Sequence, residues 1–190
     1  MIPQHIKNII FDFGAVIFDI DGSKTIKSFR DMNITQFDSF HDFLISHKNE
    51  ALFMDIEIGA ISPNQFRDTI RSWAKSPITD AQIDNAWNAM LVGYVPERLD
   101  LLQELRSKYR TFLLSNTNII HWQYFTDLLK PYGFNGLHEL FEKEYYSHTV
   151  GMRKPNFDIF KYVLKDAELF AGETLFLDDN LKNVEAARML

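Results

Sequence analysis

The sequence predicts an α/β protein built on a doubly wound parallel sheet, and two patterns support this. Three short apolar runs rich in aliphatic and aromatic residues have the composition of strands buried on both faces. They span residues 9–11, 111–114 and 174–177. Helical periodicity lies between these runs, as expected when crossover helices connect parallel strands. Helices are therefore expected on both faces of the sheet.

A long helical stretch interrupts this alternation after the first strand. Ser62 with Gln65 and Thr79 with Gln82 form two capping boxes, each of which marks the start of a helix. Apolar side chains recur at helical spacing after both starts, and we expect them to form a hydrophobic core: Phe66, Ile70, Trp73, Ile83, Ala86, Trp87 and Met90. The predicted domains are an α/β core, residues 1–23 and 93–190, and an inserted helical domain, residues 24–92.

The other elements are predicted from local signals. The dipeptide Asp21-Gly22 favours a tight hairpin turn, which predicts a small flap beside the end of the first strand. Pro155 is suited to the first turn of a helix. The remaining predicted elements are helices at 97–108, 119–130 and 137–141, a strand at 144–147 and a closing helix that contains Val184.

Composition restricts the classes of partner. The net charge of −6 argues against a nucleic-acid partner, because binding to a phosphate backbone depends on clustered Lys and Arg. The absence of cysteine excludes disulfides and thiolate metal sites and fits a cytoplasmic protein. Acidic residues interrupt the N-terminal apolar run, so neither a signal peptide nor a membrane span is expected there. The oligomeric state is left open.

Polar residues follow all three apolar runs. These are Asp12 after the first run, Ser115 and Asn116 after the second, and Asp178 and Asp179 after the third. A lysine, Lys154, lies in a loop between the last two groups. Each of these residues has an ordinary explanation as a turn, a helix cap or a solvated charge. However, parallel strands bring their carboxyl ends to one edge of the sheet, where α/β proteins bind ligands.

In this order, the motifs resemble those of the haloacid dehalogenase (HAD) superfamily: an Asp, a Ser or Thr, a Lys and an acidic pair. The sequences Phe-Asp-Phe-Gly-Ala-Val, Leu-Ser-Asn-Thr-Asn, Gly-Met-Arg-Lys-Pro and Leu-Asp-Asp-Asn are most similar to the alpha-D-glucose-1-phosphate phosphatase branch, as are residues 53–62. The resemblance implies a HAD-like Rossmannoid core with an α-helical cap of the C1 type. It also implies an Mg²⁺-dependent phosphatase for a small phosphorylated molecule such as glucose 1-phosphate.

The resemblance implies a role for each motif. Asp12 is the expected nucleophile, which forms a phospho-aspartate, and Lys154 neutralises both Asp12 and the phosphate. The Ser115 hydroxyl and the Asn116 amide are expected to bind the phosphoryl group. The expected ligands of Mg²⁺ are the carboxylates of Asp12, Asp178 and Asp179 and the main-chain carbonyl of Gly14. Asn183, one helical turn after Asp179, either steadies this metal shell or faces solvent.

Two features depart from the superfamily pattern. Gly14 occupies the position where many superfamily phosphatases carry an Asp as general acid, so the leaving oxygen lacks this proton donor. This favours a weakly basic leaving group, such as an anomeric sugar hydroxyl. The superfamily usually has one more strand after the helix in which the sequence ends. Either the sequence is truncated or that edge strand is absent.

A second acidic motif competes for the role of nucleophile. Phe18-Asp19-Ile20-Asp21-Gly22-Ser23 is similar to the superfamily's more common Asp-x-Asp-Gly-Thr motif. We favour Asp12, because choosing Asp19 leaves an awkward turn between two strands.

Two other functions remain as alternatives. A 2-haloacid dehalogenase would share Asp12, Ser115 and Lys154, but its reaction needs no metal, so the pair Asp178 and Asp179 favours phosphoryl transfer. A non-catalytic scaffold would need none of these residues.

Overall fold

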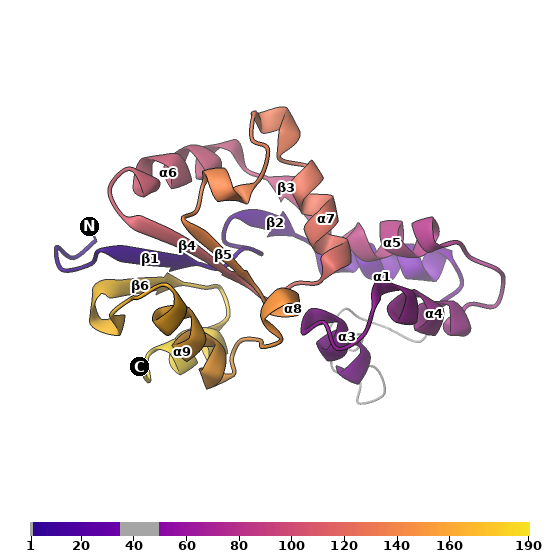
Figure 1. Ribbon diagram of the computed structural model, residues 1–190. Helices are drawn as coiled ribbons and strands as arrows, with labels where there is room; N and C mark the ends of the chain where they lie inside the picture. Colours follow the sequence, from indigo (N-terminus) through magenta and orange to yellow (C-terminus); the bar gives the residue numbers. More distant parts are fainter. Residues whose placement is uncertain (1, 35–49) are drawn as a thin grey trace.

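The computed structural model describes residues 2–34 and 50–190. A parallel sheet with its covering helices forms one part of the molecule, and a group of helices extends from one end of the sheet (Figure 1). The strand order in the sheet is β5-β4-β1-β6, with all pairs parallel. The strands are β1 (Asn8–Phe11), β4 (Arg110–Ser115), β5 (Lys143–Tyr146) and β6 (Thr174–Leu177).

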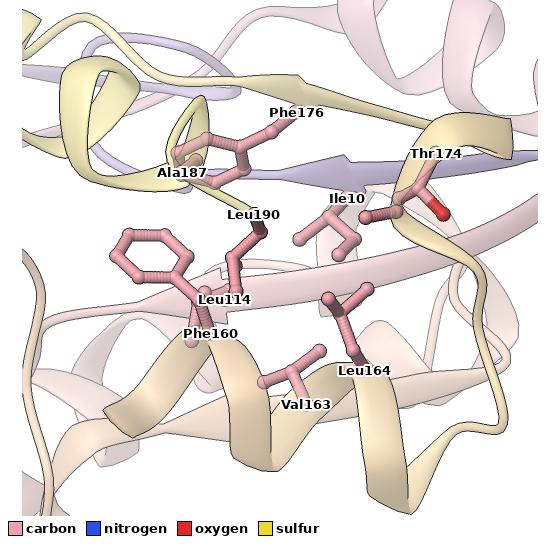
Figure 2. Close-up of a pocket in the computed structure, with 10 residues that line it drawn as sticks. Ile10, Leu114, Phe160, Val163, Leu164, Thr174, Phe176, Ala187 and Leu190 are labelled. Carbon is pink, nitrogen blue, oxygen red and sulfur yellow. The ribbon is translucent and has the colours of Figure 1, made fainter. Parts of the chain in front are cut away.

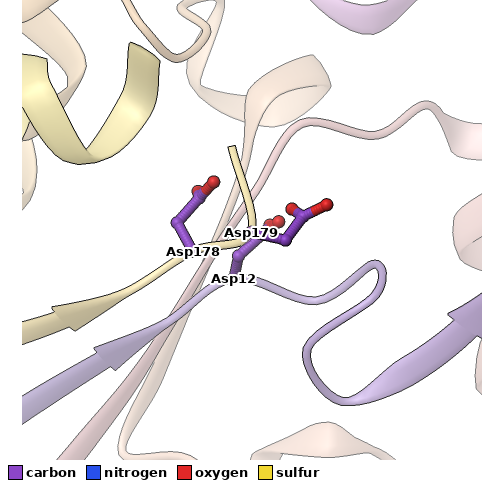
Figure 3. Close-up of side chains that lie close together, drawn as sticks. All are labelled: Asp12, Asp178 and Asp179. Atoms are coloured by element: carbon purple, nitrogen blue, oxygen red, sulfur yellow. The ribbon is translucent and has the colours of Figure 1, made fainter. Parts of the chain in front are cut away.

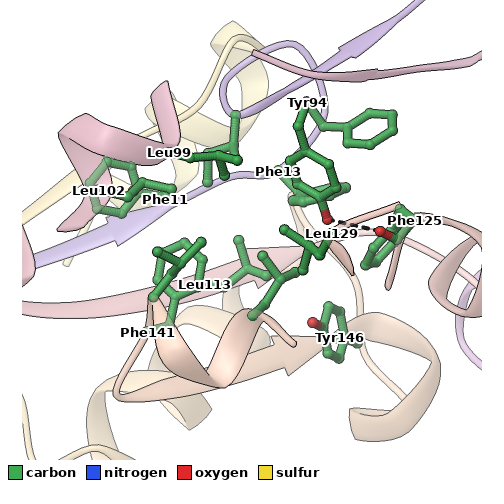
Figure 4. Packing of buried hydrophobic residues seen from close by; sticks show 14 of the residues in the cluster. Phe11, Phe13, Tyr94, Leu99, Leu102, Leu113, Phe125, Leu129, Phe141 and Tyr146 are labelled. Carbon is green, nitrogen blue, oxygen red and sulfur yellow. Dashed lines mark hydrogen bonds between the residues drawn. The ribbon is translucent and has the colours of Figure 1, made fainter. Parts of the chain in front are cut away.

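The sheet is covered on both faces because its strands alternate their side chains between two hydrophobic clusters. Phe11 and Leu113 pack on one face with side chains of α6 (Pro96–Arg106) and α7 (Ile119–Asp127), as Figure 4 shows. Ile10 packs on the other face with side chains of α9 (Phe157–Asp166) and α10 (Leu181–Ala187). The prediction of a doubly wound α/β fold is therefore confirmed.

A two-stranded antiparallel ribbon leads from the sheet to the inserted helices. It pairs β2 (Phe18–Ile20) with β3 (Leu91–Tyr94). The predicted hairpin turn at Asp21-Gly22 is wrong. The Asp21 carboxylate accepts a hydrogen bond from the Ser23 N–H at 3.0 Å, so Asp21 is the N-cap of α1 (Gly22–Asp31). The strand that pairs with β2 lies far along the chain.

The inserted helices have a hydrophobic cluster of their own. Both predicted capping boxes are present, at the starts of α4 (Pro63–Trp73) and α5 (Asp80–Asn88). The predicted core residues Phe66, Ile70, Ile83, Ala86 and Trp87 are buried, and Trp73 and Met90 pack partly buried against them. The helices are α1, α3 (Glu50–Glu57), α4 (Pro63–Trp73) and α5 (Asp80–Asn88), called the cap below. The predicted boundaries, 1–23 with 93–190 and 24–92, stay a prediction.

Short elements complete the described chain. They are η1 (Lys130–Tyr132), η2 (Leu137–Glu139), α8 (Ser147–Val150) and η3 (Ala171–Glu173). The helix predicted at 137–141 is thus only a 3₁₀ turn. Pro155 precedes α9, whose first residue is Phe157, so it does not occupy the predicted first turn. In the described part of the chain, no helix has the length and apolar character that crossing a membrane requires.

Candidate active site

Three carboxylates meet at one edge of the parallel sheet. Asp12 directly follows β1, and Asp178 and Asp179 directly follow β6, which is the neighbouring strand. The Asp12 N–H donates to the Leu177 carbonyl at 2.8 Å and so continues the strand pairing up to the acids. One oxygen from each carboxylate lies within 4.8 Å of the others (Figure 3). Carboxylate oxygens at this spacing fit a hard divalent cation such as Mg²⁺.

Lys154 is buried between two of these acids. Its Nζ lies 2.7 Å from Asp12 Oδ1 and 2.6 Å from Asp178 Oδ2, and only 1% of its side chain is exposed. Burial raises the pKa of the Asp12 carboxyl, while the Lys154 ammonium acts to lower it, and the net shift is upward. The site therefore holds a cation next to the predicted nucleophile.

Asp178 and Asp179 differ in their surroundings. The Asp178 side chain is fully buried and, besides Lys154, accepts hydrogen bonds from the Asn180 N–H at 2.8 Å and from Asn183 Nδ2 at 2.9 and 3.0 Å. Asp179 is exposed. Asn183 is buried, so the alternative in which it faces solvent is wrong. Asp178 thus anchors Lys154 and α10, and Asp179 has a carboxylate open to a ligand.

The residues that follow β4 lie against residues 151–156, the loop between α8 and α9 that carries Lys154 and is called the lysine loop below. Ser115 is the last residue of β4 and is buried. The Asn116 side chain donates from Nδ2 to the Lys154 carbonyl at 2.8 Å and accepts from the Lys154 N–H at 2.9 Å. This pair of bonds fixes the backbone of Lys154 at the edge of the sheet. Binding of a phosphoryl group by Ser115 and Asn116 stays a prediction.

Gly14 has no special backbone requirement. Its φ lies outside the left-handed region, and a Cβ built on it would lie 3.5 Å from Ile20 Cδ1, which is ordinary contact. The backbone therefore accepts a Cβ at the position where a general acid would stand. The main-chain carbonyl of Gly14 remains a predicted metal ligand.

The competing motif lies on the antiparallel ribbon. Asp19 pairs with Gly93 across the ribbon, and its carboxylate accepts a hydrogen bond from Arg98 Nη1 at 2.7 Å. About half of the Asp19 side chain is exposed. Within residues 2–34 and 50–190, the cluster of acids suited to a metal contains Asp12 and not Asp19. The geometry therefore favours Asp12 as the nucleophile.

Two contacts, one of α8 and one of the lysine loop, were not predicted from the sequence. The Ser147 hydroxyl accepts from the Thr117 N–H and donates to the Thr117 carbonyl, both at 2.9 Å. An ion pair joins Glu57 of the cap to Arg153, with Oε2 and Nη2 2.9 Å apart. Both contacts join residues far apart in the sequence. The only local signals were the position of Arg153 beside Lys154 and an acid at the end of an apolar helix.

A separate hollow lies on the face of the sheet covered by α9 (Figure 2). Its lining is almost entirely apolar and consists of Ile10, Leu114, Phe160, Val163, Leu164, Ala171, Thr174, Phe176, Ala187 and Leu190. It has no titratable side chain and therefore offers no group for phosphate chemistry.

The fold and the acid cluster define the class of this protein. The sequence profile of the haloacid dehalogenase-like hydrolases matches residues 6–190. The chain belongs to this family, as its motifs predict, and it is therefore a hydrolase.

Known proteins of this family are similar over almost the whole chain. D-ribitol-5-phosphate phosphatase of Bacteroides thetaiotaomicron is 32% identical over 97% of this chain and 88% of its own length. The solved structure of HAD family enzyme BT-2542 from the same bacterium, in complex with magnesium and inorganic phosphate, has a TM-score of 0.86 and 38% identity, and the match covers 97% of this chain and 90% of that one. A predicted HAD-like family hydrolase from Porphyromonas gingivalis has a TM-score of 0.84 and 31% identity, over 98% and 88%.

Proposed function

We propose that this hydrolase is an Mg²⁺-dependent phosphatase that cleaves a small phosphomonoester through a phospho-aspartate on Asp12. The observation that carries this proposal is the buried contact of Asp12 with Lys154 beside two further acids. A phosphate monoester repels anionic nucleophiles, so a carboxylate can attack phosphorus only where cations neutralise the phosphoryl oxygens. Similarity to a phosphatase and to a magnesium and phosphate complex supports the same reaction.

The reaction proceeds in two steps. An Asp12 carboxylate oxygen attacks phosphorus, the bond from phosphorus to the alcohol oxygen breaks, and that oxygen takes up a proton from water as the alcohol leaves. Water then attacks the phosphorus of the phospho-aspartate, which releases inorganic phosphate and restores Asp12. Lys154 neutralises charge on Asp12 and on the phosphoryl group in both steps. Ser115 and Asn116 orient the phosphoryl group.

The donor set fits Mg²⁺, which prefers oxygen ligands and keeps several waters. Asp12, Asp179 and the Gly14 carbonyl would hold it, with Asp178 as a further ligand. Bound Mg²⁺ supplies a Lewis acid that neutralises phosphoryl oxygens. The contacts of Asp178 with Lys154 and Asn183 give it a second role, which is to orient the lysine.

Two observations bear on the substrate. Gly14 leaves the leaving oxygen without the usual acid, which favours a sugar 1-phosphate such as glucose 1-phosphate. The similarity to D-ribitol-5-phosphate phosphatase favours a phosphorylated polyol. We place the substrate among small sugar and polyol phosphates and the enzyme in the cytoplasm, consistent with its lack of cysteine.

A phosphatase screen tests the proposal. Glucose 1-phosphate, ribitol 5-phosphate, glucose 6-phosphate, nucleotides and small phosphorylated acids are assayed for phosphate release with Mg²⁺ and with EDTA. We expect release from at least one sugar or polyol phosphate, loss of activity in EDTA and recovery on adding Mg²⁺. Undiminished turnover in EDTA, or release of halide from a 2-haloacid, would overturn the phosphatase assignment in favour of a dehalogenase.

A further inference from the structure

The cap contacts the segment that carries Lys154 at two places. Glu57, the last residue of α3, forms the 2.9 Å ion pair with Arg153, and the Glu57 Oε2 atom is buried there without a hydrogen bond of good geometry. Gly59 follows with a φ of +70°, and a Cβ there would lie 2.5 Å from the His148 carbonyl oxygen. Only glycine allows this backbone approach. In Figure 1, α3 accordingly lies beside α8.

The same segment is also fixed to the residues that follow β4. Ser147 is bonded to the backbone of Thr117, and Lys154 is bonded through its backbone to Asn116. The segment therefore spans from the cap contact to the reacting groups. Arg153 occupies the position directly before Lys154, so any displacement of the Arg153 backbone is transmitted to the lysine.

The charges of this ion pair lie beside the lysine of the site, because Arg153 directly precedes Lys154 in the chain. Burial raises the pKa of the Glu57 carboxyl, and the positive charges of Arg153 and Lys154 act in the opposite direction. Glu57 thus interacts electrostatically with the lysine of the site as well as with its own partner. Without Glu57, Arg153 would add an uncompensated positive charge beside the phosphate, and without Arg153, Glu57 would add a negative one.

We propose that Glu57 and Arg153 form a positioning pair, which holds the cap against the Lys154 segment and balances charge beside the phosphoryl site. Neither residue touches the reacting atoms, and both act through Lys154. This inference rests on the proposed phosphatase function. It assigns the cap a role in the electrostatics of phosphate binding in addition to any contact with the substrate.

Inhibition by inorganic phosphate separates this role from a purely structural one. In the Mg²⁺-loaded enzyme, Glu57→Gln should lower the Ki of phosphate, and Arg153→Gln should raise it, each by about three- to tenfold. The double variant should return Ki to within about twofold of the wild-type value, because the pair carries no net charge. Both single variants should lower kcat, because Lys154 is less firmly placed. Glu57→Asp keeps the charge and should lower kcat while leaving Ki unchanged.

The ion pair between Arg67 and Asp84 provides the matched control. Arg67 Nη2 and Asp84 Oδ2 lie 2.8 Å apart, and the exposed fractions of the two side chains, 17% and 25%, are close to the 27% and 24% of Arg153 and Glu57. The pair lies within the cap, between α4 and α5. Asp84→Asn should leave the Ki of phosphate unchanged. A shift of Ki in the same direction for Glu57→Gln and Arg153→Gln would overturn the proposal, as would an equal shift for Asp84→Asn. If wild-type turnover is absent, the proposed function fails, and calorimetric phosphate binding by the same variants still tests the pair.

Discussion

Two neighbouring stretches of the chain carry similar acidic motifs in different environments. Asp12 directly follows β1, a central strand of the four-stranded sheet, and it is buried and contacts Lys154. Asp19 lies on the ribbon, where it is half-exposed and contacts Arg98. Each carboxylate thus has a cationic partner. The comparison shows that place in the sheet, rather than the letters of a motif, distinguishes a candidate nucleophile from an ordinary ion pair.

The difference has a physical basis. An exposed ion pair such as that of Asp19 contributes only about 0–1 kcal/mol, because water screens it. The contact of Asp12 is shielded from water, and removing either partner leaves a buried charge uncompensated. Asp21, in the same stretch as Asp19, accepts hydrogen bonds from the Ser23 hydroxyl and N–H, which hold the pKa of its carboxyl below its usual range. It is therefore a poor proton donor for the leaving group.

The largest effect is expected from removing the Asp12 carboxylate, and removal of the Asp19 carboxylate provides the comparison. Asp12→Asn should lower kcat by about 10³-fold or more and abolish trapping of the phospho-aspartate mimic beryllofluoride. Asp19→Asn should change kcat by less than about threefold, because it removes only an exposed ion pair. Steady-state kinetics measure kcat, and fluorine NMR measures the trapping of beryllofluoride. Trapping lost in Asp19→Asn and retained in Asp12→Asn would reverse the comparison.

Mg²⁺ should bind at the acid cluster that contains Asp12 and not at the ribbon that carries Asp19. Asp179→Asn should raise the Mg²⁺ concentration for half-maximal activity by about tenfold or more, because an exposed carboxylate of the acid cluster is lost. A titration of activity with Mg²⁺ after treatment with EDTA provides the measurement. Asp19→Asn serves as the control and should titrate like the wild-type enzyme. A Mg²⁺ requirement unchanged in Asp179→Asn would remove this residue from the metal site.

Adding the missing acid should sharpen the comparison further. In the wild-type enzyme, the rate should depend steeply on the pKa of the leaving group, so sugar 1-phosphates react faster than sugar 6-phosphates. Gly14→Asp should raise the rate for basic leaving groups by up to about 10²-fold, and the space beside Ile20 accommodates its Cβ. Single-turnover rates over a series of aryl and sugar phosphates test this. A flat dependence in the wild-type enzyme would mean that another group donates the proton.

The smallest effect is expected at Asp21. Asp21→Ala removes the N-cap of α1 and should lower the melting temperature by about 2–4 °C. Asp21→Asn keeps a capping oxygen and should melt close to the wild-type temperature. Calorimetry gives the melting temperatures, and kcat should change little in either variant. A large loss of kcat at an unchanged melting temperature would give Asp21 a catalytic role.

Local signals account for the parts of the structure that were predicted correctly. The apolar run before Asp12 forms the fully buried strand β1, as predicted. The run before Asp178 also forms a strand, but the prediction that it is buried is wrong, because β6 lies at the edge of the sheet and is partly exposed. The capping boxes at Ser62 and Thr79 are complete within four residues. The acids follow these strands directly, so the shared sheet edge brings them together.

Long-range pairing explains what was missed. The ribbon between β2 and β3 was not predicted, because Asp21-Gly22 is equally suited to a hairpin turn and to the start of a helix. The ion pair of Glu57 with Arg153 joins the cap to the lysine loop, and no periodicity or spacing in the sequence indicates it. Such contacts depend on how the cap is placed against the sheet.

The chain enters and leaves the cap at a single junction. The Asp21 N–H donates to the Met90 carbonyl at 2.8 Å. The Thr25 hydroxyl accepts from the Met90 N–H at 3.1 Å and donates to the Trp87 carbonyl at 3.0 Å. A segment whose two ends are held side by side can be lengthened, shortened or exchanged while the strands around it keep their register. For protein engineering, this junction is the place at which helices from another source can be grafted, so that selectivity changes while the acids stay in position. Such a graft has to keep an acid that pairs with Arg153.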